Sequence, residues 1–119
     1  MKPELILMHS PLTTKKYRII FPTKGKPEGT PNHIDFGDIN YNDYIIYNLH
    51  YGKNVADIRR ENYLARHAAR EDWTDPYSSG FWSRFLLWEK RSLKSAIRNI
   101  ERMLGVSIVV GDTVPQRRG

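Results

Sequence analysis

The chain of 119 residues contains no cysteine, which excludes disulfide bonds and thiolate metal ligands and is typical of proteins in a reducing compartment. Long hydrophobic runs are also missing. The apolar run near the start, Leu5 to Met8, is too short for the core of a signal peptide and far too short to span a bilayer. From the sequence we therefore expect a protein that is neither secreted nor membrane-spanning.

Motifs for metal binding and catalysis are absent as well. The four histidines are scattered, and none belongs to a zinc pattern of two histidines four residues apart. There is no glycine-rich phosphate loop, and Asp35 and Asp38 beside Gly37 are as typical of turns as of acid–base chemistry. His67 and Glu71 lie four residues apart on a predicted helix, a spacing typical of a solvated surface contact. We expect no cofactor, no metal and no enzymatic activity.

The composition describes a single folded domain. Apolar residues make up 39%, aromatic residues 12% and charged residues 27% of the chain, values that are typical of a globular protein. The formal net charge is +6, which favours either a phosphate backbone or an acidic protein surface as partner. Charge alone does not choose between them.

Short strands are predicted on both sides of a loop rich in glycine and proline. Residues 17–21 form a β-branched and aromatic run that stops at a proline, and residues 33–36 alternate polar and apolar side chains. We expect these two strands to pair antiparallel across the loop at 23–32. Residues 106–110 have the same β-type composition and predict either an edge strand or a segment that docks on a neighbour.

Helices are predicted in the second half of the chain, at 55–72, 79–89 and 93–104. The last is bounded by Ser92 as N-cap and Gly105 after its end. A shorter segment at 41–47 is compatible with a helix or, because of its β-branched residues, with a strand. The resulting fold class is α+β, with a small antiparallel sheet packed on two or three helices. We expect an N-terminal arm at 1–14, one domain at 15–105 and a C-terminal strand or tail at 106–119.

Residues 70–90 hold all three tryptophans, and the density of rings there predicts the centre of the core. A stacking surface for single-stranded nucleic acid is the alternative. Together with the apolar stripe of the last helix, the expected structural core comprises Phe81, Trp82, Phe85, Trp88, Leu93, Ile97 and Ile100.

Two basic groups are the candidate contacts to a partner or to phosphates. On helix 55–72, an apolar stripe of Val55, Ile58, Ala65 and Ala69 leaves a different face for Arg59, Arg66 and Arg70. The second group lies on the last helix and consists of Lys94, Arg98 and Arg102. Each group is compatible with phosphate binding, with docking on an acidic protein, or with an ordinary solvated face.

Five stretches carry a resemblance to a known family. They are Lys15–Pro22, His33–Gly37, Asn62–His67, Glu71-Asp72-Trp73-Thr74 and Gly80-Phe81-Trp82-Ser83-Arg84-Phe85-Leu86-Leu87-Trp88. This order resembles small uncharacterised proteins encoded by large nucleocytoplasmic (giant) DNA viruses, over roughly residues 15–105. The resemblance implies a viral origin, and it brings no catalytic motif.

A virion structural role is the function we expect, although the resemblance by itself implies only the viral origin. Such viruses cement their shells with small minor capsid proteins, and a compact core with basic faces and arms at 1–14, 23–32 and 106–119 suits a protein that bridges larger capsid subunits. Its partners would then be the major and other minor capsid proteins, and its location the virion capsid, after assembly in the host cytoplasm. The alternative is a basic nucleic-acid-binding accessory protein of the same virus.

Overall fold

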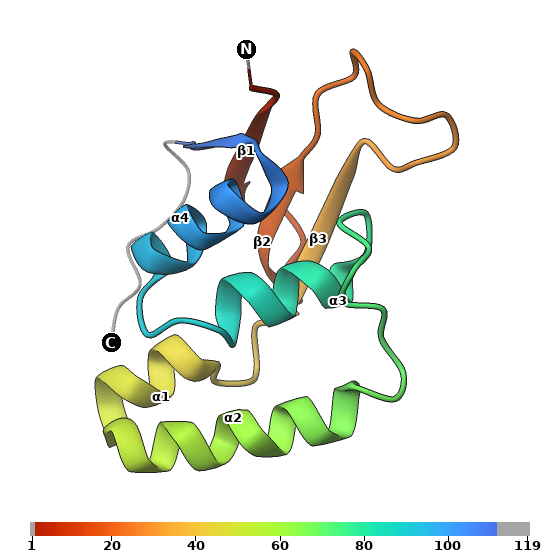
Figure 1. Cartoon of the computed structure of the whole chain (residues 1–119). Coiled ribbons are helices and arrows are strands. Elements are labelled where there is room, and N and C mark those ends of the chain that lie inside the picture. Colours follow the sequence, from red (N-terminus) through yellow and green to blue (C-terminus); the bar gives the residue numbers. More distant parts are fainter. Residues whose placement is uncertain (1, 112–119) are drawn as a thin grey trace.

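The computed structural model describes residues 2–111 and shows one four-stranded sheet (Figure 1). Its strands are β1 (Glu4–His9), β2 (Lys15–Ile20), β3 (His33–Asp38) and β4 (Ser107–Val110). Their order across the sheet is β3-β2-β1-β4. As expected, β2 and β3 pair antiparallel. The α+β class is confirmed, although the sheet is mixed, because β4 runs parallel to β1.

The predicted N-terminal arm is wrong for residues 4–9, which form β1, an inner strand of the sheet. Opposite Ile6 lies Ile20 of β2, and opposite Leu5 lies Ile108 of β4. Leu5 and Leu7 are buried, and Ile6 between them is exposed. This alternation is that of a strand with one covered face. Leu5 and Leu7 of the run Leu5 to Met8 therefore belong to the core. The C-terminal residues 112–119 of the expected tail lie outside the described residues.

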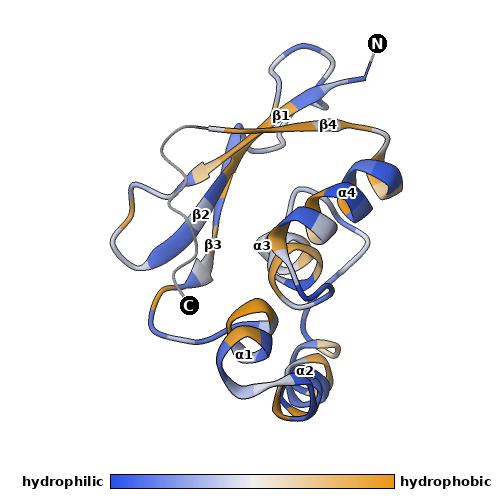
Figure 2. Ribbon diagram, turned by 90° about the vertical axis from the view of Figure 1, so that its left-hand side faces the viewer, coloured by the Kyte–Doolittle hydropathy of each residue, from blue (hydrophilic) through white to orange (hydrophobic). Residues whose placement is uncertain are grey.

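One face of the sheet is covered by the segment from residue 79 to 104 (Figure 2). This segment contains α3 (Ser79–Trp82), the π-helical turn η1 (Ser83–Leu87) and α4 (Leu93–Leu104). Trp82 has no exposed surface and lies in the core with Phe36 of β3. Of the expected core residues, Phe81, Trp82 and Ile100 are buried, and the others are partly buried against the same core, namely Phe85, Trp88, Leu93 and Ile97.

The ends of α4 lie at its capping residues. The helix α4 has the predicted bounds, with the Ser92 hydroxyl accepting from the amide of Ser95 and Gly105 in the left-handed region. The segment predicted at 79–89 breaks into α3 and η1. A π-helical turn is rare and often marks a functional site.

The remaining helices form a hairpin, α1 (Tyr44–Tyr51) and α2 (Lys53–His67), which lies beside the rest of the domain (Figure 1). The short segment is a helix, but it begins at Tyr44 because Asp43 provides its cap. The long helix ends at His67, five residues before the expected Asp72, where the amides of Arg70 and Glu71 both donate to the carbonyl of His67.

The helix α2 buries a face other than the predicted one. Val55 is 39% and Ile58 60% exposed, whereas Ala56 and Tyr63 are buried. The reason is that α2 is held by an aromatic stack and by the ion pair of Arg60 with Glu89, and not by its aliphatic stripe. Within residues 2–111, no helix combines the length and apolar character that crossing a bilayer requires.

Candidate functional site: a cleft between the helical hairpin and the sheet

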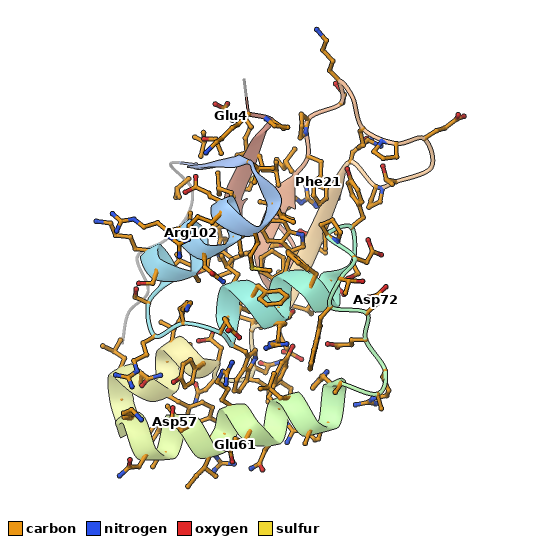
Figure 3. All side chains as sticks on the ribbon, viewed as in Figure 1. Glu4, Phe21, Asp57, Glu61, Asp72 and Arg102 are labelled. Carbon is orange, nitrogen blue, oxygen red and sulfur yellow. The ribbon has the colours of Figure 1, made fainter. Side chains whose placement is uncertain are left out.

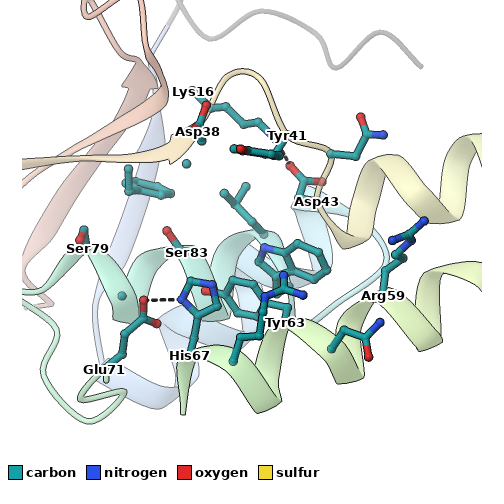
Figure 4. A pocket seen from close by; sticks show the side chains of 18 of the residues that line it. Lys16, Asp38, Tyr41, Asp43, Arg59, Tyr63, His67, Glu71, Ser79 and Ser83 are labelled. Carbon is teal, nitrogen blue, oxygen red and sulfur yellow. Dashed lines mark hydrogen bonds and ion pairs between the residues drawn. The ribbon is translucent and has the colours of Figure 1, made fainter. Parts of the chain in front are cut away.

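A cleft of about 590 Å³ lies where the hairpin meets the rest of the domain. Its lining comes from the start of β2, the end of β3, the loop that follows, both helices of the hairpin, and α3 with η1. Figure 4 shows these side chains converging from segments far apart in the sequence. The volume is in the range of small-ligand pockets.

An aromatic stack forms one wall of the cleft. The ring of Tyr63 lies between Trp88, at a centroid distance of 4.4 Å, and His67, at 4.3 Å. Burial raises the pKa of the Tyr63 hydroxyl, so this group stays neutral at physiological pH. Its oxygen is buried without a hydrogen-bond partner in the described part of the chain. The tryptophans thus divide between core and cleft.

The pair of His67 and Glu71 also belongs to this wall. Glu71 Oε2 lies 2.8 Å from His67 Nδ1, and Glu71 Oε1 accepts from Trp73 Nε1 at 2.9 Å. The two side chains are only 30% and 24% exposed, so the sequence-based interpretation as an ordinary solvated contact is incomplete. Gly80 allows α3 to lie close to the Glu71 side chain, because a Cβ at this position would be only 3.1 Å from the Glu71 carboxyl carbon.

Across the cleft, Lys16 and Asp43 form a buried ion pair. Lys16 Nζ donates to Asp43 Oδ2 at 2.8 Å, and the side chains are 10% and 2% exposed. Asp43 Oδ1 accepts from the amide of Ile46 at the start of α1. This pair therefore ties β2 to the hairpin and fixes the opening of the cleft.

Three other cations line the cleft: Lys15, Arg59 and Arg66. Across residues 2–111, none of their side chains takes part in an ion pair or hydrogen bond; Arg59 lies over the ring of Tyr47 at 5.6 Å. The three carboxylates of the lining already accept from other groups, Asp43 from Lys16, Glu71 from Trp73 and Asp38 from the amide of Asn40. The positive charge of the cleft is therefore open to a ligand.

The structure separates the predicted basic residues. Arg59 and Arg66 line the cleft, as the shared helical face suggested, but Arg70 is exposed outside the lining. The second group lies on the exposed face of α4, where Figure 3 labels Arg102, and does not line the cleft: Lys94, Arg98 and Arg102. Sequence reasoning missed Lys15 as a cleft residue, since only the register of β2 places it opposite α2.

All five stretches that carry the family resemblance contribute lining residues, among them Lys16, Gly37, Tyr63, Glu71 and Ser83. Comparison with protein-family models, curated proteins and solved structures found no match to this chain. Within residues 2–111 there is no cluster of three or more histidine, cysteine or acidic side chains that would hold a metal ion. The described lining combines the cations Lys15, Arg59 and Arg66 with the stacked rings of Tyr63 and Trp88.

Proposed function

We propose that this protein binds single-stranded nucleic acid, with the sugar-phosphate chain in the cleft between the hairpin and the sheet. The observation that carries this proposal is the meeting of Lys15, Arg59 and Arg66 in one cleft without ion-pair partners among the described residues. Unpaired guanidinium and ammonium groups are the usual ligands of phosphodiesters.

Aromatic rings at the same place support a single strand as the ligand. Tyr41 lines the cleft and is 71% exposed, so a base can stack on its ring without repacking of the core. Exposed rings next to cations are typical of sites for single strands, since an unpaired base offers its face. A duplex keeps its bases stacked against each other and gives Tyr41 no such partner.

A salt titration with two matched charge-reversal variants tests the proposal. Binding of a short labelled oligonucleotide is followed by fluorescence anisotropy for the wild type, Arg59→Glu/Arg66→Glu and Arg98→Glu/Arg102→Glu. Both variants change the net charge equally, but only the first changes the cleft. We expect the cleft variant to bind at least about tenfold more weakly and to reduce the slope of log affinity against log salt by about 1.4. The α4 variant should retain the wild-type slope.

Two outcomes contradict the proposal. One is a wild-type protein without salt-dependent binding of any single strand. The other is an equal loss of affinity in both variants, which would mean that binding follows net charge and not the cleft.

A virion structural protein, in the capsid and bridging capsid subunits, is the second candidate. It is favoured by apolar side chains that the hairpin leaves at the surface: Leu49 at 59%, Tyr51 at 58% and Ile58 at 60% exposure. Exposed apolar groups of this kind suit a protein interface. This candidate ranks second because residues 4–9 belong to the sheet, which removes most of the N-terminal arm expected to reach a neighbour.

Fractionation of purified virus particles tests the second candidate. Quantitative mass spectrometry of shell and genome-core fractions should recover a cement protein with the shell, in a fixed ratio to the major capsid protein. Recovery with the genome core would favour nucleic-acid binding, and absence from both fractions would exclude a virion role.

A further inference from the structure

The histidine in the cleft carries a second conclusion, which rests on the proposed function. We propose that His67 Nε2 accepts a hydrogen bond from a ribose 2′-hydroxyl, so that the cleft selects RNA over DNA. The inference depends on which ring nitrogen carries the proton, on whether Nε2 is open to a ligand, and on what its neighbours can donate or accept.

Glu71 determines the tautomer of the neutral ring. A carboxylate can only accept hydrogen bonds, so at a distance of 2.8 Å from Glu71 Oε2 the proton lies on His67 Nδ1. The other oxygen of Glu71 accepts from Trp73 Nε1, and an indole nitrogen can only donate. The carboxylate is thus held at both oxygens, and Nε2 of the neutral imidazole keeps its lone pair.

This nitrogen is open to a ligand. His67 lines the cleft, and its side chain is 30% exposed. Within residues 2–111, Nε2 has no hydrogen-bond partner, and it is not among the polar atoms buried without one. Figure 4 shows the imidazole between Glu71 and Tyr63, on the same side of the cleft as Arg59.

The basic side chains that line the same cleft can only donate. The side chains of Lys15, Arg59 and Arg66 have donors and no acceptor, so they suit the phosphate oxygens of a strand. His67 Nε2 is a hydrogen-bond acceptor in the same cleft as these cations. It therefore suits a donor group of the strand that lies close to a phosphate. The ribose 2′-hydroxyl is such a donor, it occurs at every nucleotide whatever the base, and deoxyribose lacks it.

Three oligonucleotides of one mixed sequence test this inference at about pH 8, above the range in which free imidazole titrates: RNA, DNA and 2′-O-methyl RNA. We expect the wild type to bind RNA about five- to tenfold more tightly than DNA, the effect of one hydrogen bond. The 2′-O-methyl strand should bind like DNA, because its oxygen has no proton to donate.

Two variants test whether His67 Nε2 is the atom that accepts the hydrogen bond. His67→Phe keeps a ring to stack on Tyr63 and removes Nε2, so RNA affinity should fall further than DNA affinity and the preference for RNA should be lost. In Glu71→Gln, Trp73 still donates to the amide oxygen, which turns the amide NH₂ toward His67 Nδ1. The ring proton then moves to Nε2, which becomes a donor. A 2′-O-methyl oxygen accepts a hydrogen bond as a hydroxyl does, so the preference for RNA over 2′-O-methyl RNA should disappear with the imidazole still in place.

The outcomes separate this inference from the proposed function. Equal wild-type affinity for RNA and DNA overturns the selection of ribose and leaves nucleic-acid binding intact. An equal loss of RNA and DNA affinity in His67→Phe means that the ring only packs, and it also overturns the inference. Absence of binding to all three strands overturns the proposed function itself.

Discussion

Tyr63 and Trp88 stack face to face, with ring centroids 4.4 Å apart and ring planes inclined by 7°. The stack joins α2 to the residue that follows η1. Beside it, Arg60 donates to the carbonyl of Trp88 at 2.7 Å and to Glu89 Oε1 at 2.6 Å. The hairpin is therefore fastened to the domain here and, across the cleft, by Lys16 and Asp43. Both walls of the cleft depend on these two attachments.

Trp88→Ala should loosen the hairpin more than the sheet. The indole is partly buried, so its loss should lower the free energy of unfolding by about 2–3 kcal/mol. Hydrogen exchange should accelerate in α1 and α2, since their local stability depends on the stack. Ile100→Ala, which empties the core beneath α4, is the control and should act on the whole domain. Equal protection of the hairpin in wild type and Trp88→Ala would contradict this role.

Lys16→Met should show the cost of removing the cation that faces a buried carboxylate. Asp43 is 1% exposed, and removing its cation should lower the free energy of unfolding by about 3 kcal/mol. Adding Asp43→Asn keeps the helix cap, because asparagine caps as well as aspartate, and removes the negative charge of the buried side chain. In urea unfolding, the double variant should therefore be more stable than Lys16→Met alone. A double variant less stable than the single one would show that the charge is not the cause.

Alanine at Gly37 should destabilise the fold more than alanine at Gly29. Both glycines have positive φ, 80° and 83°, so both substitutions bring a backbone penalty of about 1 kcal/mol. At Gly37 the new Cβ would also lie 2.8 Å from Leu87 Cδ1, whereas nothing lies within 4 Å at Gly29. We expect Gly37→Ala to cost about 2 kcal/mol more. Thermal unfolding measures the difference. Equal midpoint temperatures for Gly37→Ala and Gly29→Ala would show that Leu87 in η1 moves aside at no cost.

Asp35→Asn should remove an acid-sensitive contribution to stability. Arg18 donates to both oxygens of Asp35, at 2.9 and 3.0 Å, and Ser10 donates at 2.7 Å. The hydrogen bonds from Arg18 lower the pKa of Asp35 despite its partial burial. The stabilisation is therefore complete above the unfolded value of about 3.9 and is lost as the pH falls through the lowered folded value.

Urea unfolding at several pH values measures this contribution. At neutral pH we expect Asp35→Asn to be less stable than wild type by about 2 kcal/mol. The difference should shrink as the pH falls below about 4, because the unfolded wild-type chain then binds the proton first, and it should be smallest once the folded carboxyl is protonated as well. A constant difference down to the acid limit would assign the effect to shape and not to charge.

Elements that are encoded locally were predictable. The helix at 93–104 has a serine cap, a regular apolar stripe and a terminal glycine, and the structure has the same bounds. The strand β1 was not predicted because its apolar alternation is short and one of its two neighbours, β4, comes from the other end of the described chain. The buried face of α2 was predicted wrongly, because it is set by the stacking of Tyr63 on Trp88. This contact joins two separate segments, and the periodicity of α2 alone does not show it.

Only part of the candidate site could be predicted from the sequence. The spacing of Arg59 and Arg66 placed them on one helical face, and both line the cleft. Lys15 joins them through strand register, and His67 with Glu71 gains its role from Trp73 and from the close approach at Gly80. No spacing rule reports contacts between separate elements.

The sequence by itself determined a basic α+β domain without cysteine, with capped helices and an aromatic centre, because composition, caps and periodicity act over a few neighbouring residues. Only the tertiary structure decided which cations meet, which aromatic rings leave the core, and which nitrogen of His67 is free. These properties depend on contacts between distant segments: the sheet register places Lys15 and Lys16, and the Tyr63–Trp88 stack places α2 opposite them.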